Sequence, residues 1–155
     1  MIQKSIQILR NLQAPTGLLM ASQASVTTGY NRAWLRDNVY EALGFEAVDD
    51  KKTVVKIYRV LLDIFLKHEE KIDWAIREKP DARYKYIHAR YDPFTLDGIW
   101  EEWGNKQNDA IGAVLFKIGE LEEKEIKIIR NRHDLRILQK LVWYLESIEY
   151  CLIFF

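Results

Sequence analysis

The sequence predicts an all-α fold. Apolar residues recur at spacings of three and four in several segments, which is the period of a one-sided helix. No segment alternates apolar and polar residues for long enough to predict a sheet, and no short repeat is present. Long polar and aromatic loops alternate with short connections, as in a helical toroid whose binding loops gather at one end. An ordinary helical bundle fits the same pattern.

The first predicted helix begins near residue 2. Its apolar positions are Ile2, Ile6, Leu9 and Leu12, and Pro15 should stop it. Residues 13–33 are rich in glycine, serine, threonine and asparagine, which predicts a loop of about twenty residues. Loops this long in a compact domain usually carry a function. A short helix is expected over residues 37–43.

A single long helix is predicted over residues 49–78, with Asp49 or Asp50 as its N-terminal cap and Pro80 as its stop signal. Its apolar stripe consists of Val54, Ile57, Tyr58, Leu61, Ile64, Phe65 and His68. Residues 79–106 are predicted to be irregular, residues 108–118 helical, and the charged run 119–134 mostly solvated. A last amphipathic helix is marked by Leu135, Leu138, Leu141, Val142, Leu145 and Ile148.

Composition excludes several classes of function. With 155 residues, 48% of them hydrophobic, the chain can form the core of one domain. Its 23 basic and 23 acidic residues balance, so we expect neither nucleic acid nor a membrane as a partner. The only cysteine, Cys151, excludes a disulfide framework and a cysteine-based zinc site. His68, His88 and His133 are too dispersed to predict another metal site, and no sequence motif predicts a cofactor.

The ends of the chain bear on its location. The N-terminus has no secretory apolar core, and the C-terminal YCLIFF is far shorter than the roughly 20 residues of a membrane span. We therefore predict a cytoplasmic protein.

Residues 30–40, YNRAWLRDNVY, place Arg36 and Asp37 near Trp34 at the junction of a long loop and a helix. A guanidinium beside a carboxylate can donate to one sugar hydroxyl and accept from the next, while an indole covers the apolar side of the ring. The alternative is a structural ion pair between Arg36 and Asp37, with Asp37 as a helix N-cap. The spacing leaves both interpretations open.

Residues 103–109, WGNKQND, are the second candidate. Trp103 offers a stacking surface and Gly104 permits a tight turn. Donors and acceptors follow at Asn105, Gln107, Asn108 and Asp109. Planar amides beside an indole suit an uncharged polyhydroxy ligand better than a phosphate. A capped helix with Trp103 in the core explains the same residues equally well.

Taken together, these segments resemble a known family. GLLMASQ, YNRAWLRDNVYEALG, a long helix, HARYD, WGNKQNDAIGAVLF and LVWYLESIEY occur in the order seen in the N-terminal part of the glucoamylase-like catalytic domain of glycoside hydrolase family fifteen. The chain is especially similar to the version of this domain in phosphorylase kinase alpha and beta subunits and in prokaryotic glucoamylase-like proteins. The resemblance implies part of a six-hairpin α/α barrel, and a family reaction that hydrolyses α-linked glucosides with inversion.

The resemblance also assigns site residues. With Trp34 from the first block, the predicted substrate-binding set is Tyr30, Trp34, Arg36, Asp37, Trp103, Gln107 and Asp109. Arg36 and Asp37 would hold the hydroxyls of a terminal glucose, with Tyr30 at the pocket floor and Trp103 as its wall. The implied ligand is an α-glucan or malto-oligosaccharide. Asn105 and Lys106 depart from the residues of relatives, which leaves the fine substrate preference open.

Neither catalytic carboxylate of the family has a counterpart in residues 1–155. Inverting hydrolysis needs a general acid and a general base roughly 6.5–9.5 Å apart, and in relatives both come after the helix that matches LQKLVWYLESIEY. The sequence DGIWEE at residues 97–102 is similar to the segment that carries the general acid in relatives. It lies directly before WGNKQND, where relatives carry a variable loop, so we interpret Glu101 and Glu102 as loop residues rather than catalytic ones.

We therefore expect residues 1–155 to form one partial domain, truncated before the acid block and inactive alone. Such a domain would expose apolar helix faces. It should self-associate, fold loosely, or bind the remainder of the domain as a separate polypeptide. The alternative is a non-catalytic regulatory or interaction module like the phosphorylase kinase domain.

Overall fold

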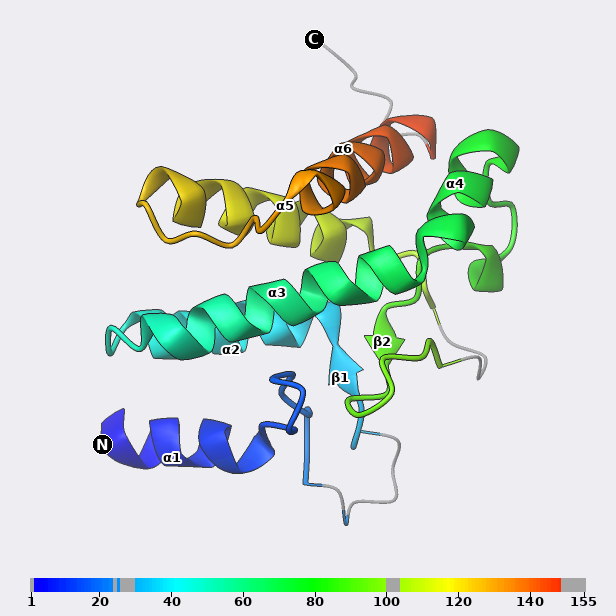
Figure 1. The fold of residues 1–155 in the computed structure, drawn as a ribbon. Helices are drawn as coiled ribbons and strands as arrows, with labels where there is room; N and C mark the ends of the chain where they lie inside the picture. The colour runs from blue at the N-terminus through cyan, green and yellow to red at the C-terminus, as the bar shows by residue number, and fades with distance from the viewer. Residues whose placement is uncertain (1, 24, 26–29, 100–103, 149–155) are drawn as a thin grey trace, which may run out of the picture.

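The fold contains two helical hairpins that lie side by side (Figure 1). The computed structural model describes residues 2–23, 25, 30–99 and 104–148. Its helices are α1 (Ile2–Leu12), α2 (Leu35–Glu46), α3 (Lys51–Lys67), α4 (Glu69–Glu78), α5 (Asn108–Glu123) and α6 (Arg132–Ser147), with a short 3-10 helix, η1 (Arg83–Lys85). The first hairpin is α2/α3 and the second is α5/α6; α2 packs on α5, and α3 packs on α6.

The all-α prediction is confirmed, with one small addition. Two strands of two residues each, β1 (Ala33–Trp34) and β2 (Arg90–Tyr91), pair antiparallel. They are too short to leave an alternating pattern in the sequence, which is why they were not predicted. Among the described residues, no helix is long and apolar enough to cross a membrane.

The helix predicted over residues 49–78 is wrong in one respect, because it is two helices. It begins as expected: the Asp50 side chain accepts a hydrogen bond from the Thr53 backbone N–H at 3.2 Å. His68 then leaves the helical conformation, and its ring Nε2 lies 2.8 Å from the Leu96 carbonyl oxygen. The break turns α4 onto α6, where Ile72 and Ala75 are buried. The apolar period runs unbroken through this point, so the sequence pattern does not reveal the break.

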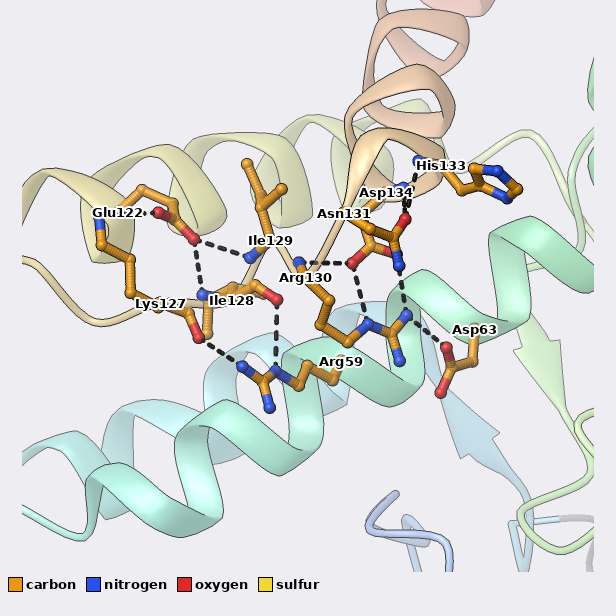
Figure 2. A network of polar contacts seen from close by, with 10 residues as sticks. All are labelled: Arg59, Asp63, Glu122, Lys127, Ile128, Ile129, Arg130, Asn131, His133 and Asp134. Carbon is orange, nitrogen blue, oxygen red and sulfur yellow. Dashed lines mark hydrogen bonds and ion pairs between the residues drawn. The ribbon is translucent and has the colours of Figure 1, made fainter.

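The charged run 119–134 is mostly exposed, as predicted, but it contains a partly buried polar network (Figure 2). Glu122 accepts hydrogen bonds from the backbone N–H groups of Ile128 and Ile129 at 2.6 and 2.7 Å. Arg130 donates to Asp134, whose side chain is completely buried at the start of α6. These bonds give the α5–α6 connection a defined shape, and hydrogen bonds from Arg59 to the Ile128 carbonyl and from Arg130 to Asp63 hold it against α3.

The last helix buries most of its predicted apolar stripe, because Leu141 and Ile148 lie in the core and Leu138 and Leu145 pack against it. Ile137, Leu141 and Tyr144 are completely buried, whereas Leu135 is 58% exposed and Val142 is 44% exposed. The leucine-rich stripe therefore points partly to solvent.

Candidate functional site

The short sheet brings the two predicted sequence blocks together. β1 belongs to the first block, and β2 immediately follows His88 and Ala89, upstream of the second. Trp34 pairs with Arg90, and the Leu35 N–H donates to the Ala89 carbonyl at 3.0 Å. Since α2 starts at β1 and packs along α5, the N-termini of both helices lie at this end of the fold.

Asn38 anchors the preceding loop to the start of α2. Its side chain is completely buried, and its Oδ1 accepts from the Leu19 N–H at 2.9 Å. Its Nδ2 donates to the carbonyls of Leu19 and Trp34. The Asn38 side chain therefore holds the backbone of these two residues in place, and it is not available to bind a ligand. The loop thus delivers Leu18 and Leu19 to the core, where both are fully buried.

Five of the seven predicted substrate-binding residues line one cavity of about 240 Å³. They are Tyr30, Trp34, Arg36, Asp37 and Gln107. A sixth, Asp109, joins them through Arg36, and Trp103 lies outside the described residues. Drug-sized ligands occupy pockets of about 300–1,000 Å³, so this cavity suits a ligand of about one small ring.

Arg36 forms a two-pronged ion pair with Asp109. Its Nε and Nη2 donate to the two carboxylate oxygens, each at 2.8 Å. This contact joins the first turn of α2 to the first turn of α5, 73 residues later. The hydrogen bond from Arg36 lowers the pKa of Asp109 below its ordinary range.

The proposed structural pair of Arg36 with Asp37 is therefore wrong, and so is the N-cap role of Asp37. The N-cap of α2 is Trp34, and Asp37 lies within the first turn. Within the described ranges, the Asp37 carboxylate receives no hydrogen bond and forms no salt bridge, although it lines the cavity. Burial raises the pKa of Asp37, and the positive charge of Arg36 only partly opposes this. Asp37 thus offers the cavity an acceptor with unused capacity.

Aromatic rings form one side of the cavity. The Tyr30 ring stacks on Trp34, with centroids 6.3 Å apart and planes 28° from parallel. The Arg90 guanidinium lies 5.7 Å from the Trp34 ring centroid, on a buried side chain. A cation beside an indole stabilises the ring in place. Tyr30 itself is 52% exposed, so part of its surface is available to a ligand.

The buried His88 packs against Asn105 of the second block. The sequence did not predict this role. Asn105 is 4% exposed; its Oδ1 accepts from the Ala89 N–H at 3.2 Å, and its Nδ2 lies 3.4 Å from His88 Nδ1. Burial lowers the pKa of His88 to about 4, so the ring is neutral at neutral pH. Asn105 therefore positions the chain before α5, while the neighbouring Gln107 reaches the cavity.

Replacing Gly98 by alanine is expected to destabilise the protein by about 1–3 kcal/mol, because of overpacking. A Cβ on Gly98 would lie 2.5 Å from His88 Cδ2, and the His88 ring is buried. Thermal unfolding measures the effect. Gly104→Ala is the matched control, because a Cβ there meets no atom of the described residues within 4 Å. Equal melting temperatures for the two variants would contradict the proposed close packing of Gly98 on His88.

Glu41 is a second residue that sequence reasoning missed. It lies four residues after Asp37 on α2, so the two carboxylates share one side of the helix. Its Oε2 is buried and accepts no hydrogen bond from the described residues. Burial, reinforced by the charge of Asp37, raises the pKa of Glu41 to about 7. The spacing of the two acids was the available signal, but it does not reveal burial.

The arrangement can bind a polar ring. Asp37 accepts, Gln107 both accepts and donates, and the Tyr30 and Trp34 rings cover an apolar surface. Within the part of the chain that the structure describes, no group of three or more histidine, cysteine or acidic side chains could hold a metal ion.

Comparisons with known proteins find chains of similar sequence. The chain is similar to the alpha regulatory subunit of phosphorylase b kinase, liver isoform, from Takifugu rubripes, with 26% identity over 152 residues. It is 25% identical over 161 residues to a probable alpha regulatory subunit of the same kinase from Caenorhabditis elegans. These matches cover 85% and 91% of this chain but only 12% and 13% of the relatives.

Solved structures show the same fold. A glycosidase variant in complex with glucose superposes with a TM-score of 0.73 and 16% identity, covering 91% of this chain and 39% of that one. A second glycosidase variant superposes with a TM-score of 0.72 over the same shares. The chain thus adopts part of the α/α barrel predicted from its sequence. The family model for glycosyl hydrolases family 15 matches residues 1–148. The chain belongs to glycosyl hydrolases family 15.

Proposed function

We propose that the cavity at the N-termini of α2 and α5 holds the terminal glucose of an α-glucan or malto-oligosaccharide. The observation that carries this proposal is the convergence of Tyr30, Trp34, Arg36, Asp37 and Gln107 on one small cavity. Membership of a glycosyl hydrolase family supports it, as does a solved relative of the same fold whose complex contains glucose.

In this proposal each group has a distinct task. The Asp37 carboxylate accepts hydrogen bonds from adjacent sugar hydroxyls, because protein groups do not occupy it within the described ranges. Asp109 holds two nitrogens of Arg36, and the third, Nη1, donates to the ligand. Tyr30 and Trp34 cover the apolar side of the ring. Trp103, which lies outside the described residues, completes the wall.

We further propose that residues 1–155 bind the sugar without cleaving it, as a partial domain in the cytoplasm. Inverting hydrolysis needs two carboxylates on opposite sides of the scissile bond. Of the two carboxylates of the site, Asp37 lines the cavity, whereas Asp109 is occupied by Arg36 and is not part of the lining. Asp37 and Asp109 therefore do not form the general acid and general base pair that inverting hydrolysis needs.

Asp37→Ala is expected to weaken maltose or acarbose binding about 10- to 100-fold, because hydrogen bonds to a charged group contribute about 1.5–3 kcal/mol. Isothermal titration calorimetry or ligand-observed NMR measures this. Asp81→Ala is the control, since it removes an exposed carboxylate that does not line the cavity. Unchanged binding in Asp37→Ala would refute the assignment. Glucose release from maltose by residues 1–155 would refute the absence of cleavage.

A non-catalytic regulatory or interaction module is the second candidate, favoured by the similarity to phosphorylase b kinase regulatory subunits. It makes a different prediction for the same titration. If neither maltose nor acarbose binds at any concentration, while the chain forms a stable complex with a partner polypeptide, the module is the better description.

A further inference from the structure

A second cavity, of about 320 Å³, lies beside α4 at an edge of the fold (Figure 1). Two lysines, a histidine and two aromatic residues line it: His68, Lys71, Trp74, Tyr84 and Lys85. None of them lines the sugar cavity. The described lining contains no carboxylate, and its surface is mostly apolar, from rings and lysine stems. We call it the α4 cavity.

The two lysines come from different elements. Lys71 lies in the first turn of α4, and its Nζ donates to the Tyr84 carbonyl at 2.9 Å. Lys85 is the last residue of η1, and its Nζ lies 5.6 Å from the centroid of the Trp74 ring. An ammonium group has three N–H donors, so it can bond a protein carbonyl and a ligand together. The α4 cavity therefore combines apolar walls with two cationic groups.

Rings provide the walls of the α4 cavity. Trp74 is partly buried, and Tyr84 is 60% exposed, so both rings can pack on a ligand. His68 stands at the break between α3 and α4, and its Nε2 lies 2.8 Å from the Leu96 carbonyl oxygen. Because a carbonyl only accepts, Nε2 carries the proton and the ring is held in place. The volume, near the lower limit for small-molecule sites, suits one ring with a substituent.

The burial of Lys71 favours a negatively charged substituent. Burial lowers the pKa of Lys71 to about 8, because it removes water from around the ammonium. The group is still mostly protonated at neutral pH. A charge shielded from water acts more strongly on a nearby charge than one in open solvent does. An anion beside Lys71 would therefore offset the cost of burying its ammonium.

A carboxylate outside the lining competes for Lys85. Lys85 Nζ lies 2.5 Å from Asp81 Oδ1, and the Asp81 side chain is 77% exposed. Exposed ion pairs of this kind contribute little to stability. A ligand anion can therefore share or take over Lys85 at small cost.

We propose that the α4 cavity binds a small aromatic ring that carries a phosphate group. The ring packs against Trp74 and Tyr84, and the phosphate lies between the ammonium groups of Lys71 and Lys85. A phosphate monoester carries about −1.5 to −2 charges at neutral pH, so it matches two ammonium groups better than a carboxylate does. This site is separate from the sugar cavity and does not depend on the function proposed for it.

Calorimetric titration of residues 1–155 with phenyl phosphate, inorganic phosphate and phenol tests the proposal. Phenyl phosphate should bind at least about tenfold more tightly than either of the other two, because only it uses both the rings and the ammonium groups. Absence of phenyl phosphate binding would overturn the proposal. Equal binding of phenol would overturn the role of the lysines, and equal binding of inorganic phosphate would overturn the role of the rings.

Lys71→Gln should weaken phenyl phosphate binding about 10- to 100-fold, because it removes a charged donor. Lys67→Gln is the matched control. It removes the same charge one turn earlier, from a lysine that donates to the Thr95 carbonyl and does not line the cavity. Lys71→Arg keeps the charge and should retain most of the binding, which separates lost binding from lost folding. Equal effects of Lys71→Gln and Lys67→Gln would contradict the assignment.

Asp81→Ala should change the affinity in the opposite direction. Loss of the carboxylate that competes for Lys85 should strengthen phenyl phosphate binding, by up to about fivefold. Weaker binding would show that Asp81 supports the site instead of competing with the ligand, and would count against the proposal. Asp37→Ala should leave phenyl phosphate binding unchanged, and Lys71→Gln should leave maltose binding unchanged, so either of the two proposed sites can fail alone.

Discussion

Asp134→Ala is expected to lower the free energy of unfolding by about 2–4 kcal/mol. The Asp134 side chain is completely buried, and its Oδ2 accepts hydrogen bonds from the backbone N–H and Nε of Arg130 at 2.7 and 2.9 Å. Its Oδ1 accepts from Arg130 Nη2 at 2.9 Å. Removal of the carboxylate leaves the Arg130 backbone N–H and Nε without an acceptor at the point where the α5–α6 connection meets α3, while Nη2 keeps Asp63 (Figure 2). Urea unfolding at neutral pH measures the loss.

The control is Asp63→Ala, which removes the other carboxylate bound to Arg130. Its side chain is 41% exposed, so solvent replaces much of the interaction and the expected loss is below about 1 kcal/mol. Equal losses from the two variants would contradict the special position of Asp134.

The effect should also depend on pH. Hydrogen bonds from Arg130 hold the pKa of Asp134 below its ordinary value of 3.8. A lowered pKa in the folded state means that the stabilisation is present above the unfolded value and disappears as the pH falls through the folded value. The difference between wild type and Asp134→Ala should therefore shrink in acid below pH 3.8.

Glu41→Gln is expected to stabilise the protein by on the order of 1–3 kcal/mol above pH 7. Burial raises the pKa of Glu41 from 4.5 to about 7 in the folded chain. The folded state therefore binds a proton more tightly than the unfolded state, and wild-type stability falls as the pH rises from about 4.5 to about 7. Glutamine stays neutral and removes this slope. Unfolding free energies measured at a series of pH values give the comparison.

Glu46→Gln on the same helix is the matched control for Glu41→Gln. Glu46 pairs with the buried Lys117 at 2.8 Å, so loss of its charge should lower stability instead of raising it. If Glu41→Gln destabilises at alkaline pH as Glu46→Gln does, Glu41 is ionised without penalty and the assigned burial effect is wrong.

Much of the fold could be predicted because its signals are local. The first helix, the cap by Asp50 and the stop before Pro80 all depend on residues within a few positions of one another. The break at His68 could not be predicted, since its cause is the distant Leu96 carbonyl and the packing of α4 on α6. The local spacing of apolar residues does not depend on such long-range contacts and so cannot predict them.

The candidate site, too, could be predicted only in part. Its chemical character was evident from the sequence, because aromatic, acidic and amide residues are concentrated in the two blocks at residues 30–37 and 103–109. The partners were not evident: the adjacent Asp37 was the plausible mate of Arg36, yet the chain pairs Arg36 with Asp109. Residues adjacent on a helix point in different directions, and only helix packing decides which distant side chain comes within reach.

The sequence alone therefore determined the helical class, several helix ends, the family resemblance and five residues that line one cavity. Tertiary structure alone decided that Asp37 is unpaired within the described residues, that Glu41 Oε2 is buried, and that Leu135 and Val142 on α6 face outward. The physical reason is the distance along the chain over which each kind of interaction acts. Propensities, caps and periodicity act over a few residues, whereas burial and ion pairing depend on which surfaces the whole chain brings together.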